Sequence, residues 1–101
     1  MKTTPYIPLY LLSKHYEVEM SFFTELNEIG LLEVVTIENE AKVHQDKIND
    51  IEKMIRLHHD MNINFEGIDV VFNLLAKIES LQNELWETNT KLQRYSQKEE
   101  E

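Results

Sequence analysis

The chain has 101 residues, of which 42% are hydrophobic and 29% charged, so it forms at most one small domain, and a multidomain enzyme is excluded. Nineteen acidic against ten basic residues give a formal net charge of −9, which disfavours any partner that is held through its phosphate groups. The absence of cysteine excludes disulfides, thiolate metal sites and a cysteine nucleophile. No cleavable signal and no apolar run of about 18 residues is recognisable, so we expect a cytoplasmic protein with no membrane partner.

Only two Gly and two Pro occur, which favours helices over a strand-and-turn architecture. Apolar residues at helical spacing predict two short helices, over Leu9–Tyr16 and Met20–Ile29, with a break at residues 17–19. Gly30 stands where a left-handed residue would end the second helix, and the two leucines after it would pack back against that helix. A helix, turn, helix arrangement follows.

A small hairpin is predicted after these helices. The segment Val34–Ile37 is rich in β-branched residues, the chain can turn at Glu38–Glu40 through Asn39, and Ala41–His44 can return as a second strand. Because two strands alone are not stable in water, we expect them to lie against the helices as a wing.

A third helix is predicted to start at Asp46 as its cap. Its apolar stripe would be formed by Ile48, Ile51, Ile55 and His58, with Met54, Leu57 and Met61 beside them. After a break at residues 62–64, Asn64 can cap a fourth helix, and Glu66 in its first turn would be favoured by the helix dipole.

The fourth helix is predicted to run without interruption from Phe65 to about Tyr95, a rod of roughly 45 Å at 1.5 Å per residue. One alternative is that its apolar stripe packs within a single chain. However, nothing else in a domain of this size could cover the stripe beyond Leu81, which favours a homodimer. The predicted dimer interface consists of Val71, Leu74, Ile78, Leu81, Leu85 and Leu92. We expect residues 97–101 to be a disordered tail.

No residues with the pattern of a catalytic site stand out, since the chain has no Gly-rich phosphate loop, no G-x-S-x-G and no H-E-x-x-H motif. We therefore expect no enzyme activity, no catalytic residues and no cofactor. His58 and His59 are adjacent, but neighbours on an α-helix point about 100° apart and could not ligate one metal ion from the same face. We expect His58 in the core stripe, His59 in solvent, and no metal site.

The second helix, Met20–Ile29, would be the DNA-reading helix of a helix-turn-helix, but it carries Glu25 and Glu28 and no Lys or Arg. Residues 1–41 hold two basic residues against seven acidic ones, where a DNA-reading surface should be positive. The charge therefore disfavours nucleic acid and favours a basic protein partner, because complementary charge steers and orients association.

The stretch YIPLYLLSKHYEVEMSFFTELNEIGLL (residues 6–32) resembles the N-terminal winged helix-turn-helix of the MerR superfamily, with Ile29–Leu32 matching its I-G-L-L closure. The stretch IRLHHDMNINFEGIDVVFNLLAKIESLQNEL (residues 55–85) more specifically resembles the CbpM-type chaperone modulators. The matching positions there are Ile55, Arg56, Leu57, Asp60, Asn64, Phe65, Gly67, Ile68 and Asn73–Leu75. DNA-reading members usually place Arg and Tyr on the second helix, where this chain has Phe22, Phe23, Glu25 and Asn27.

The resemblance implies a mainly α, bacterial, dimeric protein with a MerR-like winged domain at residues 1–64 and a dimerisation helix, pairing as a coiled coil, at residues 65–96. It also implies binding to the J-domain of a CbpA/DnaJ-like co-chaperone, which would restrain stimulation of the chaperone DnaK. The alternative is a MerR-like DNA-binding transcription regulator. From charge and expected exposure, the predicted partner-binding residues are Glu25, Glu28, Asp60, Glu66 and Asp69.

Overall fold

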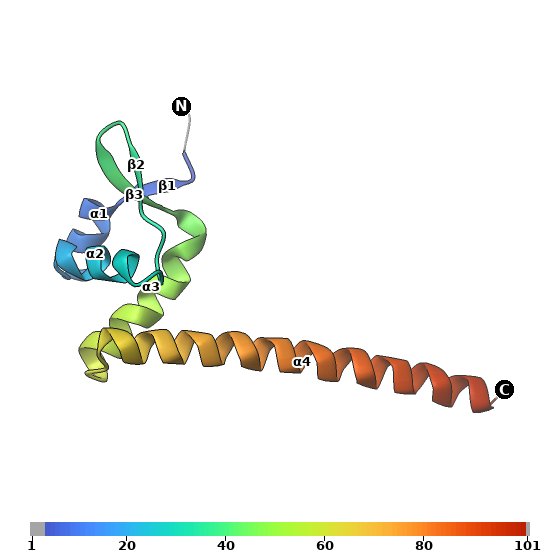
Figure 1. The fold of residues 1–101 in the computed structure, drawn as a ribbon. Coiled ribbons are helices and arrows are strands. Elements are labelled where there is room, and N and C mark those ends of the chain that lie inside the picture. Colours follow the sequence, from blue (N-terminus) through green and yellow to red (C-terminus); the bar gives the residue numbers. More distant parts are fainter. Residues whose placement is uncertain (1–3, 101) are drawn as a thin grey trace. The chain divides into compact units, whose positions relative to one another are not determined.

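The computed structural model describes residues 4–100, with side chains through Ser96. The elements follow the order β1 (Tyr6–Pro8), α1 (Leu9–Tyr16), α2 (Met20–Glu28), β2 (Val35–Ile37), β3 (Glu40–His44), a 3₁₀ turn η1 (Gln45–Lys47), α3 (Ile48–Ile55), a π-helical turn η2 (Arg56–Asp60) and α4 (Phe65–Glu100) (Figure 1). The predicted fold class, a mainly helical winged helix-turn-helix with a long C-terminal helix, is confirmed. The chain divides into two compact units between Asp69 and Val70, inside α4.

One hydrophobic core holds the first unit together. Its buried side chains are Leu9, Leu12, Val18, Phe22, Phe23, Leu26, Leu32, Val43, Ile51, Met54 and Ile68. Each large one contributes roughly 1.5–3 kcal/mol through removal of apolar surface from water. Ile68, in the first turn of α4, is fully buried. The first turn of α4 therefore belongs to this unit, which extends to Asp69.

The break between α1 and α2 is held by a reciprocal pair of hydrogen bonds. The Val18 amide donates to the Ser13 carbonyl over 3.1 Å, and the Ser13 hydroxyl donates to the Val18 carbonyl. Glu17 between them adopts the left-handed conformation, with φ 56°. Because Val18 is buried, this turn is anchored in the core, with Glu17 and Glu19 on either side of it exposed.

Helix α2 ends at a left-handed Gly30, as the sequence predicts. Gly30 has φ 84° and donates its amide to the Asn27 carbonyl over 3.2 Å, while Leu31 donates to the Leu26 carbonyl over 2.9 Å. This is the Schellman arrangement, in which a left-handed residue lets the chain satisfy the last carbonyls of a helix. The buried Leu32 then fixes the exit of the chain.

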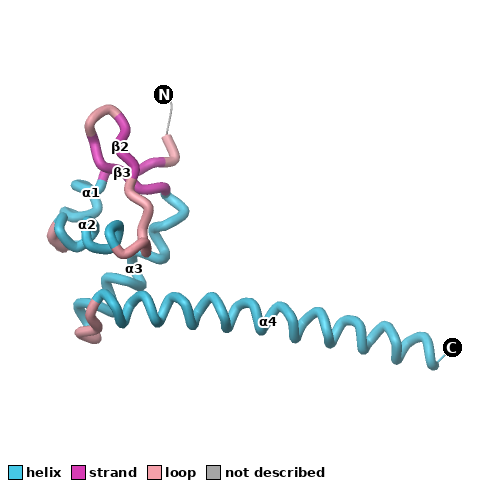
Figure 2. The backbone as a smooth tube through the Cα atoms, in the orientation of Figure 1, coloured by secondary structure: helices cyan, strands magenta, loops and turns pink. Residues whose placement is uncertain are grey.

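The sheet has three antiparallel strands in the order β1-β3-β2, drawn in magenta in Figure 2. The predicted hairpin is confirmed, with Glu38 and Asn39 both at positive φ, 51° and 65°, as a two-residue turn between twisted strands requires. The first strand, β1, was not predicted. It pairs Tyr6 with His44, and such a partner distant in sequence leaves no local signal in a three-residue strand.

The start of the third helix differs from the prediction. Asp46 does not cap it; the Asp46 amide instead donates to Nδ1 of His44 over 3.1 Å, so that His44 caps the 3₁₀ turn η1. Helix α3 begins two residues later, at Ile48, without a side-chain cap. The sequence pattern predicts one helix that continues to Met61. In the structure the α-helix ends at Ile55, and the chain continues as the π-helical turn η2.

The start of α4 matches the prediction, since Oδ1 of Asn64 accepts the Gly67 amide over 2.8 Å. The helix then continues to Glu100, because no Gly or Pro follows Gly67 to stop it. Its backbone thus includes residues 97–100 of the segment expected to be a disordered tail, while Glu101 lies outside the described residues. Disorder of this segment stays a prediction.

We predict that Gly30→Ala lowers the free energy of unfolding by about 1 kcal/mol, because a left-handed backbone disfavours any Cβ. Beyond Gly30 and its two chain neighbours, no atom lies within 4 Å of the position of the added carbon, so the loss would come from the backbone conformation alone. Urea unfolding at one fixed protein concentration measures it. Gly30→Asn is the control and should lose less, since Asn tolerates this conformation; equal losses would contradict this account.

A second prediction concerns Tyr16. Burial raises the pKa of its phenol above the ordinary 10.0, and a hydrogen bond to Glu52 and the charge of that carboxylate raise the pKa further. The fold therefore favours the neutral phenol, so its contribution to stability is present below pH 10 and is lost as pH rises through the folded pKa. Relative to Tyr16→Phe, the wild-type chain should lose urea resistance above pH 10. Parallel stability curves for the two proteins between pH 8 and 11 would contradict this.

Candidate functional site

Helix α2 presents a solvent face without positive charge. Its apolar side chains Phe22, Phe23 and Leu26 are buried, which turns the polar residues of MSFFTELNE outward. Glu25 and Glu28 are exposed on it. Oδ1 of Asn27 accepts a hydrogen bond from the Val34 amide over 3.1 Å. This bond joins the end of α2 to the segment that leads into the wing.

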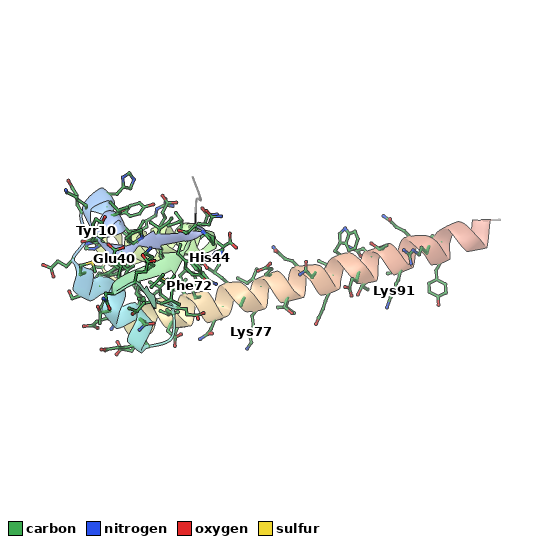
Figure 3. The ribbon with its side chains drawn as sticks, turned by 90° about the horizontal axis from the view of Figure 1, so that it is seen from above. Tyr10, Glu40, His44, Phe72, Lys77 and Lys91 are labelled. Carbon is green, nitrogen blue, oxygen red and sulfur yellow. The ribbon has the colours of Figure 1, made fainter. Side chains whose placement is uncertain are left out.

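The wing is also poor in free positive charge. Lys42 on β3 has a side chain that is 15% exposed, and its ammonium lies 3.9 Å from a carboxylate oxygen of Glu40. Figure 3 labels Glu40 and His44 at the two ends of this strand. With Glu38 in the turn, acidic residues outnumber basic ones over the hairpin Val35–His44.

An open groove of about 370 Å³ lies beside the N-terminal half of α2. Four parts of the first unit form it: the turn after α1, α2, the π-helical turn η2 and the first residue of α4. Its lining consists of Glu17, Val18, Glu19, Ser21, Phe22, Glu25, His58, His59 and Phe65. The structure thus brings three carboxylates, two imidazoles and two aromatic rings to one place.

The aromatic rings of the groove contact one another. The Phe65 ring is stacked on His58 with centroids 4.8 Å apart, and Phe22 lies 5.3 Å from His58 and 5.7 Å from Phe65. His58 Nδ1 lies 2.9 Å from the Ile63 carbonyl oxygen. Because a carbonyl only accepts, Nδ1 carries the proton and donates, which fixes the ring orientation.

The exposure of the two histidines follows the prediction in that His59 faces solvent, but both line the groove. His58 is half-buried and His59 exposed, yet both line the groove, with ring centroids 5.2 Å apart and His59 5.8 Å from Phe22. Both lie in the π-helical turn of residues 56–60, a feature frequent at functional sites. Among the described residues, no three His, Cys, Asp or Glu are placed to hold a metal ion.

The five predicted partner-binding residues lie on three elements. Glu25 lines the groove; Glu28 ends α2, Asp60 ends η2 and Glu66 is in the first turn of α4, all three exposed. Asp69, one turn further along α4, is half-buried. Sequence reasoning did not select Glu17 and Glu19, although their position at the helix break directly before α2 was a usable signal.

A second candidate surface is the apolar stripe of α4. Val71 is half-buried, whereas the exposed fractions of Leu74, Ile78, Leu81, Leu85 and Leu92 are between 49% and 62%. Spacings of three, four and seven residues place all six on one face of the helix. Lys77 and Lys91 leave the helix on the same side in Figure 3, two heptads apart. At Thr88, within the stripe, the hydroxyl donates to the Glu84 carbonyl over 2.8 Å.

The chain was compared with known proteins. A family model described as "MerR HTH family regulatory protein" matches residues 7–90. The match covers most of the chain, from the first strand into the C-terminal helix, so the chain belongs to this family. No curated protein and no solved structure matched. Among the described residues, no helix has the length and apolar character needed to cross a membrane.

Proposed function

We propose that this chain is a non-catalytic regulatory module that binds another protein through the acidic surface of its first unit. More specifically, it is a CbpM-type chaperone modulator that binds the J-domain of a CbpA/DnaJ-like co-chaperone and thereby restrains stimulation of DnaK in the bacterial cytoplasm. The observation that carries this proposal is the α2 surface, where a DNA-reading helix would need cations and this chain exposes Glu25 and Glu28.

The charge of the whole first unit supports the proposal. Residues 4–69 contain five Lys or Arg and thirteen Asp or Glu, a formal charge of −8 within the total of −9. J-domains in general dock on DnaK through a basic helix, so an acidic protein could occupy that helix in competition with DnaK. The resemblance of residues 55–85 to CbpM-type modulators points to the same partner.

The second candidate function is a DNA-binding transcription regulator. The family match and the winged helix-turn-helix fold favour it, since this fold reads DNA through its second helix and pairs two domains on two half-sites. The acidic α2 and the paired Lys42 count against it, because the phosphate backbone would be repelled where it has to approach most closely.

The proposal includes a homodimer formed through α4. A helix draws most of its stability from packing of its apolar face, and the second unit is one helix whose leucines are 42% to 62% exposed. A second copy offers the same stripe and would cover it, with roughly 1.5–3 kcal/mol gained for each leucine that becomes fully buried.

The partner prediction is tested by titrating the purified J-domain of a CbpA-like co-chaperone into the full-length protein by calorimetry. Conversion of Glu25, Glu28, Asp60, Glu66 and Asp69 to their amides should weaken binding about tenfold or more, since each exposed charge pair contributes roughly 0.2–1 kcal/mol. The matched control removes five other carboxylates of the first unit and should change affinity less. These are Glu33, Glu38, Glu40, Asp46 and Asp50.

Two results would contradict the partner prediction. One is that the wild-type protein shows no J-domain binding at low salt. The other is specific capture of a DNA fragment in a gel shift, with an affinity that falls steeply as salt rises, which would favour the regulator.

For the dimer, we predict that Leu81→Glu with Leu85→Glu converts the protein to a monomer in sedimentation at micromolar concentration, because two charges would enter an apolar interface. The control, Ser80→Glu with Asn83→Glu, adds the same charges on exposed positions outside the stripe and should stay dimeric. A wild-type protein that sediments as a monomer would contradict the interface assignment.

A further inference from the structure

The groove beside α2 is lined by both acidic and aromatic side chains. Its lining carries three carboxylates, from Glu17, Glu19 and Glu25, and no Lys or Arg. Among residues 4–96, whose side chains are described, no ion pair involves any of the three, and Glu19 accepts only a 3.3 Å hydrogen bond from the neighbouring Ser21 hydroxyl. These carboxylates are therefore available to a ligand.

The apolar part of the groove is aromatic. Phe22 and Phe65 reach it from α2 and from the start of α4, and the His58 ring contacts both of them. The interplanar angles within this group are 29° to 44°, so the rings are tilted rather than perpendicular to one another. Faces of aromatic rings attract cations through their negative quadrupole.

The combination of carboxylates and aromatic faces selects among possible occupants. An anion would be repelled, and a metal ion lacks a suitable ligand set among the described residues. A lysine ammonium is compact and strongly hydrated, whereas an arginine guanidinium is planar, stacks on aromatic faces and carries five donors in a fixed fork. A groove lined by three carboxylates and by aromatic rings fits the guanidinium best.

We propose that this groove is the specificity pocket of the interaction surface and receives an arginine side chain from a basic helical segment of the protein partner. The inference rests on the proposed function in that the occupant belongs to a bound protein. It goes further by assigning the contact to Glu17, Glu19, Phe22 and Phe65 together with Glu25, four of which the charge-based assignment did not include.

The groove is well placed for such a contact. It has a wide mouth, so a side chain can enter while its own helix stays outside, and its volume of about 370 Å³ is at the lower end of roughly 300–1,000 Å³ for ligand pockets. The buried Val18 and Phe22 fix the α1–α2 turn, and the Asn64 cap fixes Phe65. The site is thus largely preformed, which reduces the entropic cost of binding.

The test uses the full-length, isotope-labelled protein and two synthetic helical peptides that differ only in carrying three Arg or three Lys. In NMR titrations the Arg peptide should perturb the Phe22 and Phe65 rings and the amides of residues 17–25 saturably, and should bind at least threefold more tightly than the Lys peptide. Equal affinities, or perturbations confined to other surfaces, would overturn the assignment of arginine to this groove.

Variants separate the pocket from the general charge. Glu17→Gln, Glu19→Gln and Glu25→Gln together should weaken the Arg peptide at least tenfold, while Glu33→Gln, Glu38→Gln and Glu40→Gln should change its affinity by less than threefold. Phe65→Leu, which keeps the volume apolar but removes the ring, should reduce the preference for Arg over Lys. Equal losses in the two triple variants would overturn the proposal; circular dichroism verifies that each variant is folded.

The same variants are then titrated with the J-domain, which distinguishes the two proposals. If the J-domain binds the wild-type protein and both triple variants alike, the groove assignment fails and the proposed function stands. If the Arg peptide occupies the groove but the J-domain does not bind, the proposed partner fails and the groove assignment stands. Loss of J-domain binding in the groove variant alone supports both.

Discussion

Burial of the apolar side of α2 is the constraint on which the rest of the first unit depends. Phe23 and Leu26 are completely buried and Phe22 nearly so, which leaves one orientation of the helix in which its polar residues face water. The same core contains Ile51 of α3 and Ile68 at the start of α4. The position of every charged residue on α2 therefore follows from packing, and the exposed carboxylates are a consequence of where the phenylalanines must go.

This packing also builds the groove. Phe22 belongs to both, since its side chain is buried in the core and its ring meets His58, His59 and Phe65 at the groove. Both histidines lie in the π-helical turn at residues 56–60 and their rings lie close to Phe22, and the Asn64 cap sets where Phe65 starts its helix. The core and the proposed binding groove thus share Phe22, so Phe22→Ala would disturb both at once, whereas the exposed carboxylates can be changed without loss of core packing.

A winged helix-turn-helix fold does not by itself specify DNA as the ligand. The MerR family fold is present here, but α2, the second helix of the helix-turn-helix, lacks Lys and Arg, and the one lysine of the wing strands lies beside Glu40. Affinity for a duplex depends on neutralising phosphates, which an acidic helix at this position does not do. The proposed basic protein partner accords with this charge. Proteins that share a fold can have different functions, because function depends on the side chains of a particular site.

Features governed by neighbours in sequence were predictable from the sequence alone. The two short helices, the Gly30 closure, the Glu38–Asn39 turn, the Asn64 cap and the start of α4 each depend on hydrogen bonds or backbone preferences within a few residues. One local feature was predicted wrongly. The sequence pattern indicated Asp46 as a helix cap, whereas the side chain of His44 caps the 3₁₀ turn η1.

Other features depend on residues brought together from distant parts of the chain, and only the tertiary structure decided them. Strand β1 exists because β3 offers it a partner, and the π-helical turn replaces a regular helix in a segment whose α-helical spacing was otherwise good. The groove joins Glu17 and Glu25 to His58 and Phe65, residues some forty positions apart. Local propensity carries no information about such contacts, because their free energy comes from packing that exists only once the chain has folded.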